Sequence, residues 1–157
     1  MTTTNDDQPT TDAPGGRAPD PHGACVRSTT EAIELVARLV GTAHRRQWWL
    51  LMLDDEGRVA PVLPRVEMPR RFGEGEAERL AGLLAHLLDA GLPRLVVVWE
   101  RPDVEDAAAL IGPSLLHAAL ARRRRELLTQ VVVQPGARVS AWEPGTTTVG
   151  GPAASAR

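Results

Sequence analysis

The chain has very little of several residue types that build special sites. It has 157 residues with a single cysteine (Cys25), one phenylalanine and no tyrosine, and all 18 cationic side chains are arginine because lysine is absent. A single cysteine excludes a disulfide within the chain and a zinc site made of cysteines. No apolar run approaches the roughly 18 residues of a membrane-spanning helix, so we expect no membrane partner.

The charge balance and the N-terminal composition narrow the class of protein further. The formal net charge is -2, so no overall positive field draws the protein to nucleic acid. The N-terminal segment is polar and acidic and lacks the apolar stretch of a secretion signal. We therefore expect a cytoplasmic location.

Both ends of the chain are poor in large apolar residues. Residues 1–27 are rich in Thr, Asp, Pro and Gly, and residues 145–157 consist mainly of Gly, Thr, Pro and Ala. Such segments bury too little apolar surface to offset the entropy of ordering. We predict a disordered N-terminal arm at 1–27, one α/β domain at 28–144 and a disordered tail at 145–157.

Apolar periodicity predicts three helices. The first spans Thr29–Val40, because Ser28 and Glu31 form a capping box before apolar residues at helical spacing. The second spans Glu76–Ala90 and ends before Gly91. The third spans Glu105–Arg125, with an interruption at Gly112-Pro113-Ser114, because proline breaks an interior helical turn.

The remaining apolar runs predict two hairpins and a central strand. One hairpin joins residues 48–53 to 58–66, where two prolines make the second strand an edge or bulged piece. Residues 94–99 lack polar alternation and predict a strand covered on both faces. Residues 128–133 and 138–142 predict the last hairpin. The order helix, hairpin, helix, strand, helix, hairpin indicates a single α/β sandwich with a mixed sheet, and no glycine-rich phosphate loop of a doubly wound fold is present.

This order, together with four short motifs, resembles the RadC-type branch of the JAB/MPN (JAMM) domains. The motifs are Trp49-Leu50-Leu51-Met52-Leu53-Asp54 with Arg58-Val59, Leu95 to Val98 followed by Pro102, Leu127 to Val133, and Val139-Ser140 with Glu143 and Gly145. The resemblance covers about residues 28–145. It implies a metalloprotease-like fold in which two histidines and an aspartate bind zinc and a glutamate activates the water.

The positions that correspond to these ligands hold other residues. Trp99 and Arg101 occupy the histidine places, the aspartate place falls near Ala109, and the glutamate place falls near Arg46 or Gln47. Tryptophan and arginine do not ligate zinc, and an arginine cation would repel it. We therefore assign no catalytic residue, no cofactor and no metal ligand. What the resemblance then implies is a non-catalytic scaffold that binds a protein partner or a second copy of itself.

Two surfaces are candidates for that partner. The first is the sheet edge at 58–66, and the second is a loop that begins at the end of the central strand, with Trp99, Glu100, Arg101 and Asp103 as possible interaction residues. An alternative hypothesis is an enzyme or cation-binding site, because Glu100, Arg101, Asp103 and Asp106 gather beside a strand end, where ligands bind in open α/β sheets.

The other chemistry-bearing residues offer less specific patterns. Arg122 to Arg125 could contact nucleic-acid phosphates, as in a nucleic-acid accessory protein, or an acidic partner, or could simply complement the dipole at a helix end. The four histidines form no metal-binding motif. Adjacent Trp48 and Trp49 must face opposite sides of a strand, so one is expected in the core and the other under a helix or exposed.

Overall fold

The computed structural model describes residues 23–103 and 111–145 and shows a mixed α/β fold, as the sequence predicts. Its helices are α1 (Thr29–Val40), α2 (Glu74–Asp89) and α4 (Ile111–Arg122), and its strands are β1 (Gln47–Leu53), β2 (Arg65–Glu67), β3 (Arg94–Glu100), β4 (Thr129–Gln134) and β5 (Arg138–Trp142). The five strands form one sheet in the order β2-β1-β3-β4-β5. The β3–β4 pair is parallel and the other pairs are antiparallel, so the sheet is mixed.

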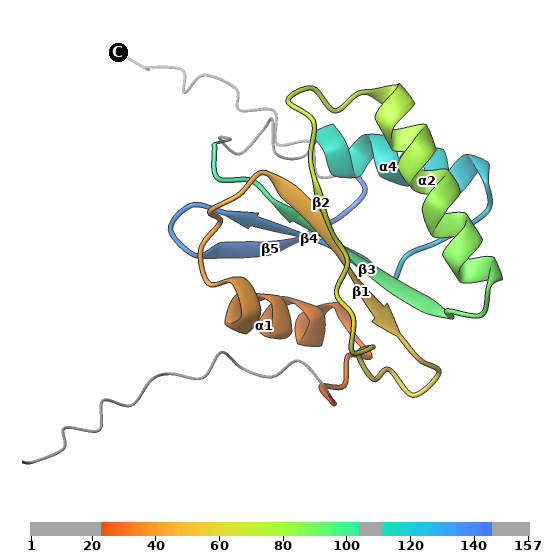
Figure 1. The fold of residues 1–157 in the computed structure, drawn as a ribbon, viewed down its shortest axis with the longest axis horizontal. Helices are drawn as coiled ribbons and strands as arrows, with labels where there is room; N and C mark the ends of the chain where they lie inside the picture. Colours follow the sequence, from red (N-terminus) through yellow and green to blue (C-terminus); the bar gives the residue numbers. More distant parts are fainter. Residues whose placement is uncertain (1–22, 104–110, 146–157) are drawn as a thin grey trace, which may run out of the picture.

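Helices cover both faces of the sheet. Figure 1 shows α1 on one face and α2 with α4 on the other. The central strand β3 is buried along Leu95–Glu100, which agrees with its uninterrupted apolar sequence. The result is a three-layer arrangement in which the central strand β3 is buried between the helices on both faces.

Side-chain alternation along the strands divides the core into two clusters. On β3, Leu95, Val97 and Trp99 pack toward α2 and α4, whereas Val96 and Val98 pack toward α1. Trp48 and Trp49 follow the same rule and lie in opposite clusters, and both are buried. The prediction that they face opposite sides is confirmed, and neither indole is exposed.

The predicted helix boundaries agree closely with the observed ones. The Ser28 hydroxyl accepts from the Glu31 backbone N–H at 3.2 Å, and the Ser28 N–H donates to the Glu31 carboxylate at 3.2 Å, which confirms the capping box. Helix α2 begins two residues earlier than predicted. Helix α4 is continuous from Ile111 to Arg122, so the interruption predicted at Gly112-Pro113-Ser114 does not occur within the described residues, and the helix ends before the predicted Arg125. The earlier part of the third predicted helix falls on 104–110, outside the described residues.

The predicted N-terminal arm is too long at its inner end. The Val26 side chain is fully buried, and its N–H donates to the Gly57 carbonyl at 2.7 Å. The Val59 N–H donates to the Ala24 carbonyl at 3.0 Å. Gly57 has a φ of +82°, and a Cβ there would lie 2.7 Å from the Val26 oxygen, so glycine permits the close approach. The folded domain thus begins before Ser28; residues 1–22 and 146–157 lie outside the described part.

The second strand of the first hairpin is shorter than predicted. Regular pairing with β1 is confined to Arg65–Glu67, although Val59 also makes a single bridge with Leu53. Pro61 and Pro64 lie between these two contacts and cannot donate backbone hydrogen bonds. The expected position of this segment, at the edge of the sheet, is confirmed. Among the helices of residues 23–103 and 111–145, none combines the length and apolar character needed to cross a membrane.

Candidate functional site at the end of the central strand

Trp99, the first residue of the predicted interaction loop, is part of the core. Its side chain has no exposed area, and its indole N–H donates to the Gln130 side-chain oxygen at 2.9 Å. The Gln130 amide in turn donates to the Pro113 carbonyl at 3.1 Å. A Cβ on Gly112 would lie 2.8 Å from the indole ring, so α4 packs directly against it. Trp99 therefore fixes α4 to the sheet and presents no surface to a partner.

Glu100 has a structural role on the α1 face of the sheet. Its side chain is 5% exposed. One carboxylate oxygen accepts from the backbone N–H groups of His44 and Arg45 at 2.9 and 3.1 Å, and the other accepts from the Gln47 side chain at 2.5 Å. Charge-assisted bonds of this kind are the stronger hydrogen bonds of proteins. Glu100 thus holds the loop between α1 and β1 in place, and both of its carboxylate oxygens accept hydrogen bonds within the chain.

Arg101 lies next to Glu100 in sequence but belongs to the other face of the sheet. The side chains of consecutive extended residues point to opposite faces, and the Arg101 backbone continues the sheet by donating to the Val133 carbonyl at 2.9 Å. Arg101 is only 8% exposed, and its Nε has no hydrogen-bond partner among the described residues. The predicted pairing of Glu100 with Arg101 in one polar pocket therefore does not form.

The charge of Arg46 acts on Arg101. Extending the β1–β3 register by one residue from the Gln47–Glu100 pair sets Arg46 opposite Arg101. Burial lowers the pKa of Arg101 from its ordinary value, and the positive charge of Arg46 lowers it further. Arg46 itself forms an ion pair with Asp103 and donates to the Arg70 carbonyl at 2.8 Å. The sequence analysis named Arg46 and Arg101 separately, at the places of a glutamate and a histidine, and only the register of β1 with β3 sets the two arginines opposite each other.

The remaining members of the predicted loop are more exposed or lie outside the described residues. Asp103 is 44% exposed at its side chain and is the only one of the four possible interaction residues on the surface. Asp106, the fourth member of the proposed enzyme or cation site, lies outside the described residues. Of the three described members, Asp103 forms an ion pair with Arg46, and Arg101 experiences the like charge of Arg46.

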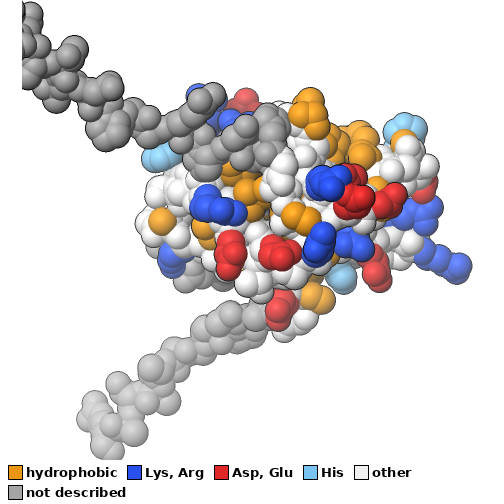
Figure 2. All heavy atoms as spheres, turned by 90° about the horizontal axis from the view of Figure 1, so that it is seen from below, with side chains coloured by type: hydrophobic (Ala, Val, Ile, Leu, Met, Phe, Trp, Pro, Cys, Tyr) orange, Lys and Arg blue, Asp and Glu red, His pale blue; other side chains and the backbone are white. Residues whose placement is uncertain are grey.

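Three of the four consecutive arginines form ion pairs that join the C-terminal end of α4 to α2. Arg122 and Arg123 both pair with Glu78, and Arg125 pairs with Asp89 at 2.6 Å. The hydrogen bonds from Arg122 and Arg123 hold the pKa of the Glu78 carboxyl below its ordinary value. Figure 2 shows side chains of both signs interspersed over the face seen from below rather than a continuous basic patch. This arrangement favours the helix-end interpretation over contact with nucleic-acid phosphates.

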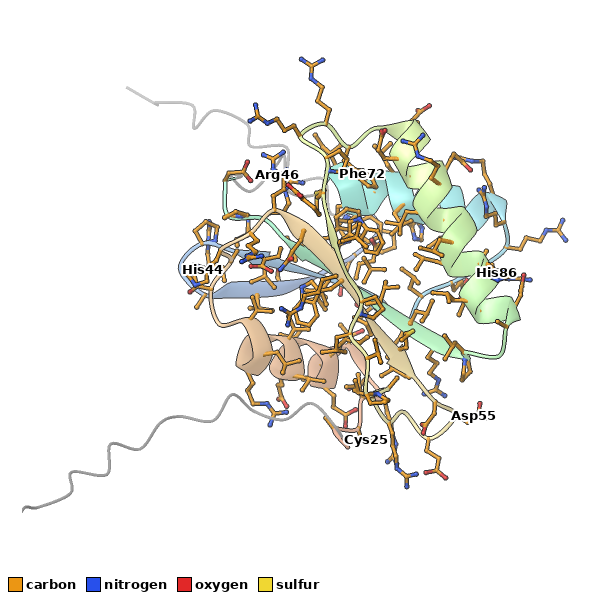
Figure 3. The ribbon with its side chains drawn as sticks, in the orientation of Figure 1. Cys25, His44, Arg46, Asp55, Phe72 and His86 are labelled. Atoms are coloured by element: carbon orange, nitrogen blue, oxygen red, sulfur yellow. The ribbon has the colours of Figure 1, made fainter. Side chains whose placement is uncertain are left out.

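Among the described histidines, no metal-binding group is formed, and His22 lies outside the described residues. His44 and His86 lie on opposite sides of the molecule (Figure 3), and no group of three or more metal-ligating side chains exists among residues 23–103 and 111–145. His117 packs against Trp142 with ring centroids 5.1 Å apart. Both line a groove of about 930 Å³ between the C-terminal end of α4 and β5, which includes none of the four residues of the predicted interaction loop.

The edge strand β2 has more exposed residues along its length than the other edge strand, β5. Arg65, Val66 and Glu67 are all exposed, and Val62 just before them is 63% exposed. The Leu50 N–H donates to the Pro64 carbonyl at 3.1 Å, and the Met68 N–H donates to the Arg46 carbonyl at 3.0 Å, so the even-numbered residues of this segment form the hydrogen-bonded pairs. In an antiparallel pair the intervening residues direct their backbone groups away from the partner strand. The N–H and C=O groups of Arg65 and Glu67 therefore face outward.

The chain matches no protein-family model, and no curated protein matches it significantly in sequence. The resemblance to the RadC-type JAB/MPN domains thus depends on the motifs and on the order of the elements.

Proposed function

We propose that this protein is a non-catalytic protein-interaction domain with a fold of the JAB/MPN type, and that its partner binds along the open edge of β2. The observation that carries the proposal is the outward-facing backbone of Arg65 and Glu67 at the end of the sheet. An unpaired strand edge is a template for an added strand, and many peptide-binding domains use it in this way.

The side chains around this edge indicate the chemistry of the partner. Residues 62–71 contain one acidic residue, Glu67, and three exposed arginines, which are Arg65, Arg70 and Arg71. Arg65 also lies over the Trp49 ring, 5.6 Å from its centroid. Val62 and Val66 add exposed apolar surface, with 63% and 42% exposed. This combination suits a short extended segment that carries acidic and apolar side chains.

Three residues at the places of the family's catalytic centre support the non-catalytic part of the proposal. Trp99 is buried in the core. Arg46, just before β1, and Arg101, just after β3, place two positive charges at these strand ends. Cations oppose the binding of a metal ion. An enzyme built on the carboxylate cluster is less well supported, because the carboxylate of Glu100 is fully engaged by the α1–β1 loop. We also propose a cytoplasmic location, in keeping with the free thiol of Cys25.

The test replaces Glu67 with proline. Because the Glu67 N–H faces outward, Glu67→Pro removes an edge donor without breaking a β1–β2 hydrogen bond. Wild-type protein and variant are each used to capture partners from the native host under mild cross-linking. We expect at least one protein held by the wild type to be lost with Glu67→Pro and with the double charge reversal of Arg70 and Arg71 to glutamate.

The matched control is Arg38→Glu, which reverses an exposed charge on α1, away from the edge. It should retain every captured partner. Identical sets of captured proteins for wild type, Glu67→Pro and the double reversal would contradict the proposal. If the cross-linked species is a dimer of this chain that Glu67→Pro abolishes, the edge is used and the partner is a second copy.

A further inference from the structure

The guanidinium of Arg101 is a buried cation without a counter-charge among the described residues. Its side chain is 8% exposed, its Nε is buried without a hydrogen-bond partner, and the guanidinium makes no ion pair or hydrogen bond with residues 23–103 or 111–145. Buried charges in proteins are normally paired and hydrogen-bonded, because removing an ion from water is costly. An arrangement of this kind indicates that the partner of Arg101 is a group outside the described chain.

The surroundings of Arg101 increase the excess of positive charge. Arg46 faces Arg101 across the β1–β3 pair, where like charges directly opposite each other repel. Asp103 offsets the charge of Arg46 through their ion pair. Glu100 does not neutralise the charge of Arg101. The Glu100 carboxylate lies on the other face of the sheet and accepts three hydrogen bonds from the α1–β1 loop and β1. The two guanidinium groups and Asp103 together leave one positive charge unbalanced.

The location is one where ligands commonly bind. Arg101 follows the carboxyl end of β3, which is parallel to its neighbour β4, and its N–H bonds to Val133 near the carboxyl end of β4. Crevices beyond the carboxyl ends of parallel strands are the usual ligand sites of open α/β sheets. Gln134 follows Val133 and is also buried, so the end of β4 brings a second polar side chain to this edge.

We propose that Arg101 and Arg46 form a binding site for a small oxyanion of the phosphate or carboxylate class. A guanidinium presents parallel N–H groups that match two oxygens of such an anion. Phosphate has enough oxygens to engage both arginines, so it should bind more tightly than a monocarboxylate. This site is separate from the β2 edge, and its existence does not depend on the proposed protein partner.

The test is thermal unfolding of the full chain in inorganic phosphate and in chloride at equal ionic strength and pH. For the wild type we expect phosphate to raise Tm by about 6 °C when its concentration is about 20 times the dissociation constant. Arg101→Met should lose this increase, whereas Arg38→Met, which removes an exposed arginine on α1, should keep it. Acetate is run in parallel, and an increase with acetate that equals or exceeds the phosphate increase narrows the ligand to carboxylates.

General stabilisation by phosphate is the main competing effect, because excluded salts stabilise any folded protein. Equal increases in Tm for the wild type, Arg101→Met and Arg38→Met would therefore overturn the proposal, as would no increase in the wild type with either anion. If Arg101→Met does not fold, Arg101→Lys provides the second variant. Lysine keeps the positive charge but lacks the parallel N–H donors with which a guanidinium binds two oxygens of one anion. Titration calorimetry with phosphate should then show binding at least about tenfold weaker than for the wild type; equal affinity would overturn the site.

Discussion

Glu100 and Arg101 are adjacent in sequence, carry opposite charges and are both more than nine-tenths buried, yet their environments differ completely. The Glu100 carboxylate on the α1 face accepts three hydrogen bonds, whereas the Arg101 guanidinium on the other face has no partner among the described residues. The difference shows that burial alone does not reveal the role of a charged side chain. A satisfied buried charge maintains the fold, and an unsatisfied one at a strand end indicates a place for a ligand.

The largest expected effect comes from removing the satisfied charge. Glu100→Ala leaves the N–H groups of His44 and Arg45 and the Gln47 amide without their acceptor. Since hydrogen bonds to a charged group contribute about 1.5–3 kcal/mol each and are not additive, we expect the free energy of unfolding in urea to fall by about 3 kcal/mol. Glu34→Ala removes an exposed carboxylate from the neighbouring helix α1 and should change stability by less than about 0.5 kcal/mol. Similar values for both variants would show that the hydrogen bonds to Glu100 are unimportant.

A smaller effect is expected where charges pair on the surface. The pKa of Glu78 is lowered in the folded protein by Arg122 and Arg123, so its contribution to stability is present above the ordinary carboxyl pKa of 4.5 and is lost as the pH falls through the lowered value. Glu78→Gln should therefore reduce the urea midpoint slightly at pH 7 and leave it unchanged at strongly acidic pH. Because the side chains are partly exposed, the effect is screened by salt.

The control for this prediction removes the cause of the pKa shift. In a background where Arg122 and Arg123 are both replaced by methionine, adding Glu78→Gln should change the midpoint little at any pH. If the Glu78→Gln substitution still shifts the midpoint in that background, or if its effect grows toward acidic pH, the assigned ion pairs are contradicted.

Local signals predicted the elements well. The Ser28–Glu31 capping box and the apolar stripe of α1 are contained within a dozen residues, so the helix at Thr29–Val40 could be predicted to the residue. Pro61 and Pro64 correctly indicated an edge strand, but the strand was predicted over 58–66, whereas β2 is confined to Arg65–Glu67. The fold class follows from the order of such locally determined elements.

Contacts between distant residues were not predictable in the same way. Val26 is ordered by Gly57, about 30 residues away, so composition alone extended the disordered arm too far. The partners of Arg122 to Arg125 lie on α2, and nothing near the arginine run reveals them. The candidate site is an intermediate case. The motifs grouped Glu100, Arg101 and Asp103 in one loop. The strand in fact continues past Trp99, and because side chains alternate along a strand, Glu100 and Arg101 point to opposite faces of the sheet.

The central claim is that β3 ends with a satisfied carboxylate on one face and, on the other, a guanidinium that the described residues leave unsatisfied. The most direct measurement is the free energy of unfolding of Glu100→Ala and Arg101→Met in chloride buffer without phosphate or carboxylates. We expect Glu100→Ala to lose about 3 kcal/mol and Arg101→Met to retain or gain stability, by up to about 1 kcal/mol, because methionine removes an unpaired buried charge at similar volume. A loss of about 2 kcal/mol or more for Arg101→Met would show that the guanidinium already has a partner within the folded chain, and would contradict the account.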